Sequence, residues 1–239
     1  MAAIEILTLF FSFFGGLGGL IFVYQSLKQK IRYKQIWLDK VAQLGPSMTI
    51  NFFIETLGSP VFINTFGKLK QHVFLHDLFY ADAIADADGQ VVMYSITTRS
   101  RDFNPILRVN EGGNPSLHVI LGKTSFADLG LSSGKIRSGL GNRRAFYVEE
   151  YYLGNPGLYQ TYGFSVNDAG YPPDVEVDTP QLLNAGITDT TDPKIQELRK
   201  ESIINTYTIA APFSMSMSEI APMRLGVDQD QIRTMGKYR

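Results

Sequence analysis

The sequence contains no cysteine in its 239 residues. Without thiols the chain can form neither disulfides nor thiolate metal sites, and it carries no cysteine nucleophile and no cysteine that could accept a lipid. The fold is therefore compatible with a reducing or an oxidising compartment. The length predicts a full-sized hydrophobic core, in one large domain or two small ones.

A dominant charge is also absent, because 22 Lys and Arg residues are balanced by 23 Asp and Glu residues. A chain without a net basic field has no general attraction to nucleic acid. We therefore expect no nucleic-acid partner.

Histidine is scarce, and the zincin motif H-E-x-x-H and the P-loop do not occur. The three histidines are His72, His76 and His118. His72 and His76 would share one face of a strand or a helix, which permits a metal pair, but no third ligand accompanies them. We predict no catalytic residue, no metal site and no cofactor.

The main feature that is present is an uncharged, apolar segment at 6–24, whose hydroxyl side chains are Thr8 and Ser12. At about 1.5 Å per residue, a helix of this length spans close to the roughly 30 Å hydrocarbon core of a bilayer. Glu5 precedes the segment and a basic cluster follows it, which is the reverse of a cleavable signal peptide. The basic cluster consists of Lys28, Lys30, Arg32 and Lys34. We predict a retained single-pass anchor at 1–26.

The basic cluster also predicts the orientation of the chain. By the positive-inside rule it stays in the cytoplasm and leaves the short N-terminus outside. We therefore expect the bacterial inner membrane, with residues 46–239 in the cytoplasm.

Two faces of the N-terminal helix are candidates for packing. Gly15 and Gly19 form a G-x-x-x-G pair, which lets two membrane helices approach closely, although glycine is also common in membrane helices for other reasons. A juxtamembrane helix is predicted at 27–45, and an apolar seam with heptad spacing runs along it. The seam consists of Tyr24, Leu27, Ile31, Leu38 and Val41. It faces away from the glycines, and it either meets another copy or packs on the soluble domain of its own chain.

Residues 46–239 are predicted to form an α+β domain with a mostly antiparallel sheet and a few short helices. Ser47 is a candidate N-cap for a helix at 49–57, which Gly58 closes. Two β-rich runs between 76 and 99 flank the turn Asp-Ala-Asp-Gly, and they predict a hairpin rather than a calcium loop.

A family resemblance covers part of this region, 46–103. A short helix ending in L-G-x-P, followed by the D-x-D-G turn and the strand VVMYSITTR, resembles the helix-and-hairpin unit of BamE (SmpA/OmlA) domains. The resemblance implies a local fold and a binding role, and it assigns no role to any residue.

The remainder, 104–239, contains a second hairpin signal. The runs RAFYVEEYYL and LYQTYGFSV flank the turn Gly-Asn-Pro-Gly at 154–157. Asp192 followed by Pro193 predicts the start of a helix, and 203–213 is predicted as a final strand.

A second resemblance covers most of the chain. The segments WLDK, GLGNRRAFY, YYLGNPGLYQTYGFSVNDAG and GVDQDQIR are similar to an uncharacterised family of bacterial single-pass membrane-anchored proteins. That family has no assigned activity, so the resemblance implies the architecture and not the chemistry.

The best candidate for a ligand site is the aromatic hairpin. Glu149 and Glu150 are adjacent, so on a strand they point to opposite faces and cannot act as a carboxylate pair. Aromatic side chains with an arginine suit a planar ligand, through stacking and cation–π contact. The candidate residues are Arg144, Glu150, Tyr152, Tyr159, Asn167 and Asp168. The alternative is that they cover a two-sided sheet.

From these observations we predict a non-enzymatic binding or sensing protein, held in the membrane by one helix and acting by self-association or with the product of a neighbouring gene. Two alternatives stay open. One is a membrane effector whose helices assemble and perturb the bilayer on signal binding, and the other is an enzyme with an unrecognised site at the aromatic hairpin.

Overall fold

The structure is a computed structural model, and it divides into two units, Met1–Asp39 and Lys40–Arg239. It describes residues 23–109, 117–131, 134–140, 145–155, 157, 159–171, 192–212, 217–220, 225–228 and 232. The anchor segment as far as residue 22, with Gly15 and Gly19, lies outside these residues. In the described part of the chain, no helix combines the length and apolar character that crossing a bilayer requires.

The described part of the first unit is helical, and the helix predicted at 27–45 is present as far as residue 42. Gln35 Nε2 donates a hydrogen bond to Asp39 Oδ1 at 2.8 Å, and the rings of Tyr33 and Trp37 meet edge to face. Both pairs are four residues apart, which places each on one face of the helix.

The second unit begins with the short helix α2 (Ile50–Leu57), which Gly58 ends with φ 93° as predicted. The N-cap is Thr49, whose hydroxyl accepts from the Phe52 amide at 3.3 Å. The prediction that Ser47 is the cap was wrong. Ser47 has φ 65°, a left-handed conformation, and so it lies in the turn before the helix.

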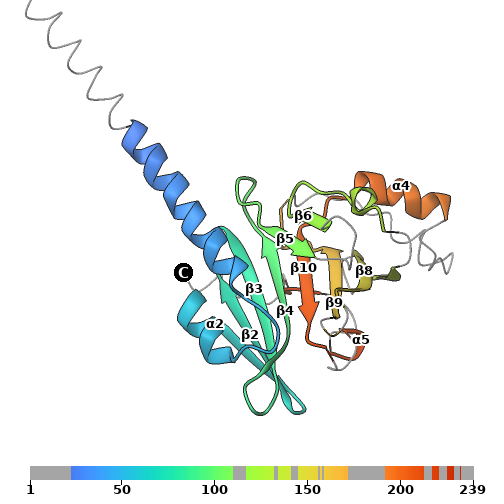
Figure 1. The fold of residues 1–239 in the computed structure, drawn as a ribbon, viewed down its shortest axis with the longest axis horizontal. Coiled ribbons are helices and arrows are strands. Elements are labelled where there is room, and N and C mark those ends of the chain that lie inside the picture. The colour runs from blue at the N-terminus through green and yellow to red at the C-terminus, as the bar shows by residue number, and fades with distance from the viewer. Residues whose placement is uncertain are drawn as a thin grey trace, which may run out of the picture. The chain divides into compact units, whose positions relative to one another are not determined.

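An antiparallel sheet of eight strands forms the centre of this unit, which confirms the α+β class with a mostly antiparallel sheet (Figure 1). The order of its strands is β1-β2-β3-β4-β10-β9-β8-β7, and β5 and β6 form a separate pair. The strands are β1 (Phe62–Phe66), β2 (Leu69–Leu75), β3 (Phe79–Ala85), β4 (Val91–Thr98), β5 (Ile106–Val109), β6 (Leu117–Ile120), β7 (Lys135–Leu140), β8 (Ala145–Leu153), β9 (Gln160–Val166) and β10 (Thr206–Ala210).

Both predicted hairpins are confirmed as β3–β4 and β8–β9. At the first turn the Asp86 carboxylate accepts from the amides of Asp88 and Gln90, and Gly89 has φ 78°. The aspartates therefore shape the turn. The predicted final strand is also present as β10, which lies between β4 and β9.

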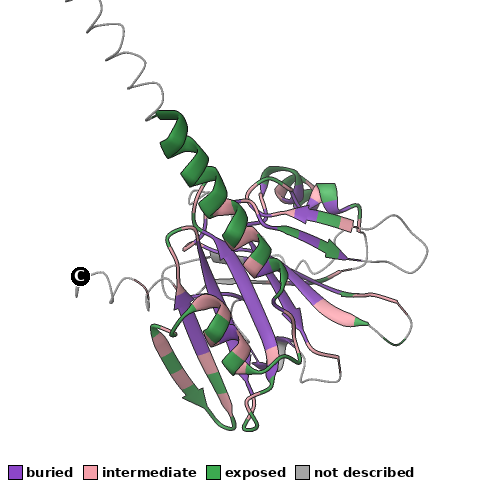
Figure 2. Cartoon of the chain, turned by 60° about the vertical axis from the view of Figure 1, so that its left-hand side comes forward, coloured by how far each residue is buried: buried purple, intermediate pink, exposed green. Residues whose placement is uncertain are grey.

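Each face of the sheet has its own cover. One face packs against α2, through Phe53 on Tyr94, and against the 3-10 helix η1 (Ala127–Leu129), through Phe126 on Tyr147. We call it the α4 face, because α4 (Pro193–Glu201) contacts η1 there. The other face packs against Met217, Ile220, Leu225, Val227 and Ile232, and we call it the C-terminal face. Buried residues are concentrated in the central strands (Figure 2).

Candidate functional site

Strand β8 presents alternate side chains to the two faces of the sheet. Tyr147, Glu149 and Tyr151 belong to the α4 face, and Glu150 and Tyr152 to the C-terminal face. The adjacent glutamates therefore point apart, as the sequence predicted.

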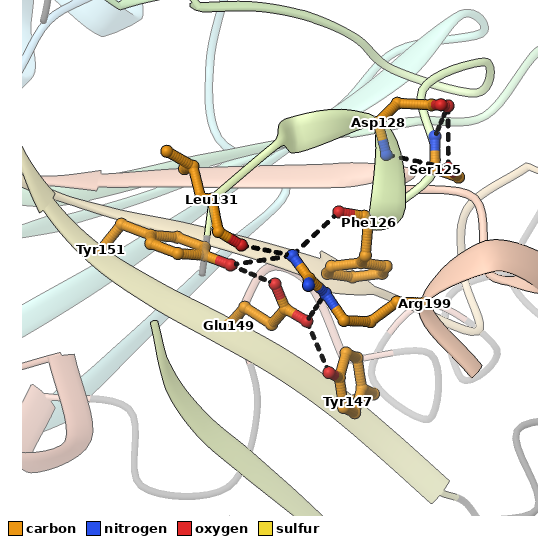
Figure 3. Close-up of polar contacts among 8 residues, drawn as sticks. All are labelled: Ser125, Phe126, Asp128, Leu131, Tyr147, Glu149, Tyr151 and Arg199. Carbon is orange, nitrogen blue, oxygen red and sulfur yellow. Dashed lines mark hydrogen bonds and ion pairs between the residues drawn. The ribbon is translucent and has the colours of Figure 1, made fainter. Parts of the chain in front are cut away.

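Glu149 is the centre of a buried polar cluster, which we call the Glu149 cluster (Figure 3). Its side chain is 0% exposed. Tyr147 Oη donates to Glu149 Oε1 at 2.5 Å, and Tyr151 Oη donates to Oε2. The carboxylate oxygens thus each accept from one tyrosine.

Arg199 enters this cluster from α4, the helix that Asp192 caps as predicted. Its Nε lies 2.9 Å from Glu149 Oε1 as an ion pair. Its Nη2 donates to the carbonyl oxygens of Phe126 at 3.1 Å and Leu131 at 2.8 Å, and lies 3.5 Å from Tyr151 Oη. One guanidinium therefore ties α4 to β8 and to the segment around η1.

Burial sets the electrostatics of the Glu149 cluster. Desolvation raises the pKa of Glu149, and the two tyrosine donors and Arg199 oppose that rise. Burial and the neighbouring carboxylate raise the pKa values of Tyr147 and Tyr151 well above their usual range, so both stay protonated and act as donors. Since three donors converge on one carboxyl group, the ionised form of Glu149 fits the site.

Burial limits the reactions in which the Glu149 cluster can take part. Glu149 and Arg199 form an ion pair with each other, and both side chains are buried away from any substrate. A buried polar network of this kind favours one packing arrangement. The Glu149 cluster thus has a structural role, because it connects α4 to β8 and to the segment around η1.

Among the predicted site residues that the structure describes, Tyr152 and Tyr159 form an exposed pair. The rings of Tyr152 and Tyr159 stack at 5.2 Å across the end of the β8–β9 hairpin, and Tyr152 is 65% exposed. Glu150 is buried on the same face of β8 and forms an ion pair with Arg137 of β7.

Of the other described residues, Asn167 lies away from this pair. Asn167 follows the far end of β9, is buried, and donates to the carbonyl oxygens of Leu225 and Val227. Its amide therefore binds the segment 225–227, which covers the C-terminal face of the sheet. Asp168 comes next and is half-buried, and Arg144 lies outside the described residues. Strand β9 separates Asn167 from Tyr159 by its whole length, so the structure places these two predicted residues at opposite ends of the strand.

The two neighbouring histidines have separate environments. His72 is buried on β2, where desolvation lowers its pKa. His76 stacks on Phe79, and its Nδ1 accepts from the Leu78 amide at 3.2 Å. Among the described residues, no three potential ligands gather into a metal site.

Sequence reasoning missed Arg199 and the two tyrosines that bond Glu149. A signal existed, because Y-x-E-x-Y on a strand places a carboxylate between two tyrosines on one face. Arg199 also lies four residues after the buried Ile195, on the inner face of α4.

The sequence also contains a G-x-S-x-G pattern at 130–134. In a hydrolase this motif lies between a strand and a helix. Here it follows η1 and precedes strand β7, and its serines lie outside the described residues. The pattern therefore does not indicate a nucleophile.

Comparisons with family models, curated proteins and solved structures find no significant match to the chain.

Proposed function

We propose that this chain is a single-pass, membrane-anchored interaction protein without catalytic activity, whose α+β domain lies in the cytoplasm. One observation carries the proposal. Along the N-terminal helix, Tyr24, Leu27 and Ile31 are 65%, 55% and 67% exposed, and they follow the heptad spacing of the predicted seam.

A single helix has no core in which to bury such a stripe. Burying one Leu or Ile side chain is worth about 1.5–3 kcal/mol, so two helices that share this seam gain several kcal/mol. The first expected partner of the helix is therefore a second copy of itself.

The charges of the same helix support an anchor. Lys28, Lys30 and Arg32 are exposed, and they follow directly on the apolar segment at 6–24. Basic residues beside a membrane helix attract anionic headgroups by about 1 kcal/mol each. The positive-inside rule then favours a cytoplasmic domain.

The absence of a catalytic role is supported by the Glu149 cluster. Its carboxylate and its guanidinium are buried against each other, and the exposed part of the predicted site is an aromatic pair, Tyr152 and Tyr159. An exposed aromatic pair suits binding by stacking.

The seam can be tested in the full chain, solubilised in detergent. The double substitution Leu27→Glu with Ile31→Glu places charges in the seam, whereas Gln25→Glu with Gln29→Glu adds the same charges, at the same spacing, off the seam. We expect the first variant to lose self-association in light scattering and the second to retain it. Equal assembly of both variants would contradict the proposal.

Orientation is tested by a periplasmic alkaline phosphatase fused after Arg239. An inactive fusion is expected, and an active one would place the domain outside. Overproduction distinguishes the effector alternative, because growth arrest with membrane leakage, lost in the seam variant, would favour an effector over a passive interaction protein.

A further inference from the structure

Strand β1 forms one edge of the eight-stranded sheet, and β2 is the strand that pairs with it among the described residues. Its side chains are unusually apolar for an edge. Ile63 is 55% exposed, Phe66 is also exposed, and so is Val61, which directly precedes the strand. Every residue of β1 is half-buried or exposed, and Figure 2 shows this edge strand in pink and green.

Proteins commonly block an edge strand with charge, proline or a bulge, because its free N–H and C=O groups can pair with another strand. The five residues of β1, Phe-Ile-Asn-Thr-Phe, contain no charge and no proline, and their register with β2 is continuous. The other edge, β7, carries Lys135 and Arg137. The two edges of the sheet therefore differ in their protection.

The order of residues in β1 also matches itself. If two β1 strands run antiparallel about a two-fold axis at Asn64, each Phe62 lies opposite a Phe66, and each Ile63 lies opposite a Thr65. Aromatic pairs and pairs with β-branched residues are favourable across antiparallel strands. A two-fold axis requires such a self-complementary patch.

We propose that two copies of this chain join edge to edge through β1, so that their sheets form one continuous sheet. A second copy is the occupant that the self-complementary order of β1 favours, and the charges favour β1 over β7 as the edge that pairs. Self-pairing of β1 brings no like charges together, whereas self-pairing of β7 would place Lys135 and Arg137 against their own copies. The interface belongs to the α+β unit and does not depend on the helix seam.

A cross-link tests the interface directly, because the chain has no native cysteine. In the proposed pair the two Asn64 positions lie opposite each other, with Cβ atoms about 4.5–5.5 Å apart, which a disulfide can bridge with little adjustment. Asn64→Cys in the full chain should give a disulfide-linked dimer under mild oxidation. Lys135→Cys, exposed on the other edge, is the matched control and should stay monomeric.

Charge at the edge provides a second test. Thr65 is exposed, so its substitution leaves the core intact. In the Asn64→Cys background, Thr65→Glu should lower the yield of dimer at least tenfold, because two carboxylates then flank the axis. Thr65→Gln, of the same size and uncharged, should leave the yield unchanged. Equal yields from Glu and Gln would overturn the proposal.

The edge and the seam are separated by combining their variants. Asn64→Cys should still cross-link when Leu27→Glu and Ile31→Glu remove the seam. If the cross-link forms in the parent background but not in the seam variant, the β1 interface depends on the helix and the proposal of an independent interface is overturned. If no cross-link forms in either background, β1 pairing is overturned and the proposed function is unaffected. A disulfide-linked dimer in the seam variant supports β1 pairing even if the helix does not self-associate.

Discussion

Both faces of the sheet bury carboxyl groups, and Glu149 on one face and Asp82 on the other differ in how they are bonded. On the α4 face, both oxygens of Glu149 accept hydrogen bonds and Arg199 lies beside them. On the C-terminal face, Asp82 of β3 accepts one bond, from Gln71 Nε2 at 3.0 Å, and its Oδ1 has no hydrogen-bond partner in the described part of the chain.

This difference decides which form of each group the fold tolerates. Two tyrosine donors and a cation compensate the ionised form of Glu149. Asp82 has one amide donor, and burial raises its pKa to about 7. Burial raises the pKa of both carboxyl groups, and donors and cations beside a carboxylate oppose that rise.

The largest effect is expected from Arg199→Met, which leaves Glu149 buried without its cation and frees the carbonyl groups of Phe126 and Leu131. Breaking a buried ion pair from one side costs about 3–5 kcal/mol. Denaturant unfolding of the full chain in detergent should show a loss of that size.

Two further variants sharpen this result. Lys200→Met, on the exposed side of the same helix, should be nearly neutral. Adding Glu149→Gln to Arg199→Met should recover part of the loss, because the unpaired charge is then gone. An additive double mutant would contradict the coupling.

The second effect is a pH dependence at Asp82. An unfolded Asp ionises near pH 4, whereas the folded chain keeps the proton to about pH 7, so the folded state binds more protons between these values. Stability is therefore lost as pH rises from about 4 to about 7. Asp82→Asn should be stabilised over the parent by up to roughly 4 kcal/mol above pH 7, and by little at pH 4.

Thermal unfolding at pH 4 and pH 8 measures this difference. Asp88→Asn, at an exposed position in the β3–β4 turn, is the control and should show no such change. A gain of equal size at both pH values would mean that ionisation of Asp82 is not its cause.

A smaller effect tests how closely the C-terminal face is covered. Gly226 has φ 84°, and an added Cβ would lie 2.8 Å from Thr97 Oγ1. Gly226→Ala should cost about 1–3 kcal/mol. Gly157 has φ 85°, and no atom of the described residues lies within 4 Å of its Cβ position, so Gly157→Ala measures mainly the backbone strain. Equal losses from both would show that the cover yields to the methyl group.

The smallest effect on stability is expected at the exposed tyrosine pair. Tyr152→Ser removes the stack on Tyr159 and should cost about 0.5 kcal/mol, since most of the ring is in solvent. Tyr152→Phe keeps the stack and should match the parent in the same unfolding experiment. A loss above roughly 2 kcal/mol for the serine variant would assign this pair to the core instead.

Much of the fold was predictable where local chemistry decides it. Some features depend only on a few neighbouring residues, and the structure contains them. They are the turns at Gly89 and Gly157, the helix cap at Asp192 and the alternation along the strands. The pair β1–β2 was missed although Gly67-Lys68 joins two β-rich runs. The run before that turn, V-F-I-N-T-F, alternates poorly between apolar and polar residues, so its period gives little signal.

The candidate site was less predictable, because it depends on segments far apart in the chain. Arg199 meets Glu149 from a distant part of the sequence, and Asn167 bonds Leu225 and Val227. Periodicity places a residue on a face, but it does not say which distant segment covers that face. For the same reason, the sequence did not predict that β10 lies in the middle of the sheet.

That placement has a consequence for synthesis. β10 pairs with β4 on one side and β9 on the other, so it joins the two halves of the sheet. While a ribosome makes the chain, β4 and β9 both wait with open edges until residues 206–210 have emerged. Such late, long-range pairing slows folding and exposes edges to other nascent chains. The sheet therefore becomes continuous only after residues 206–210 have left the ribosome.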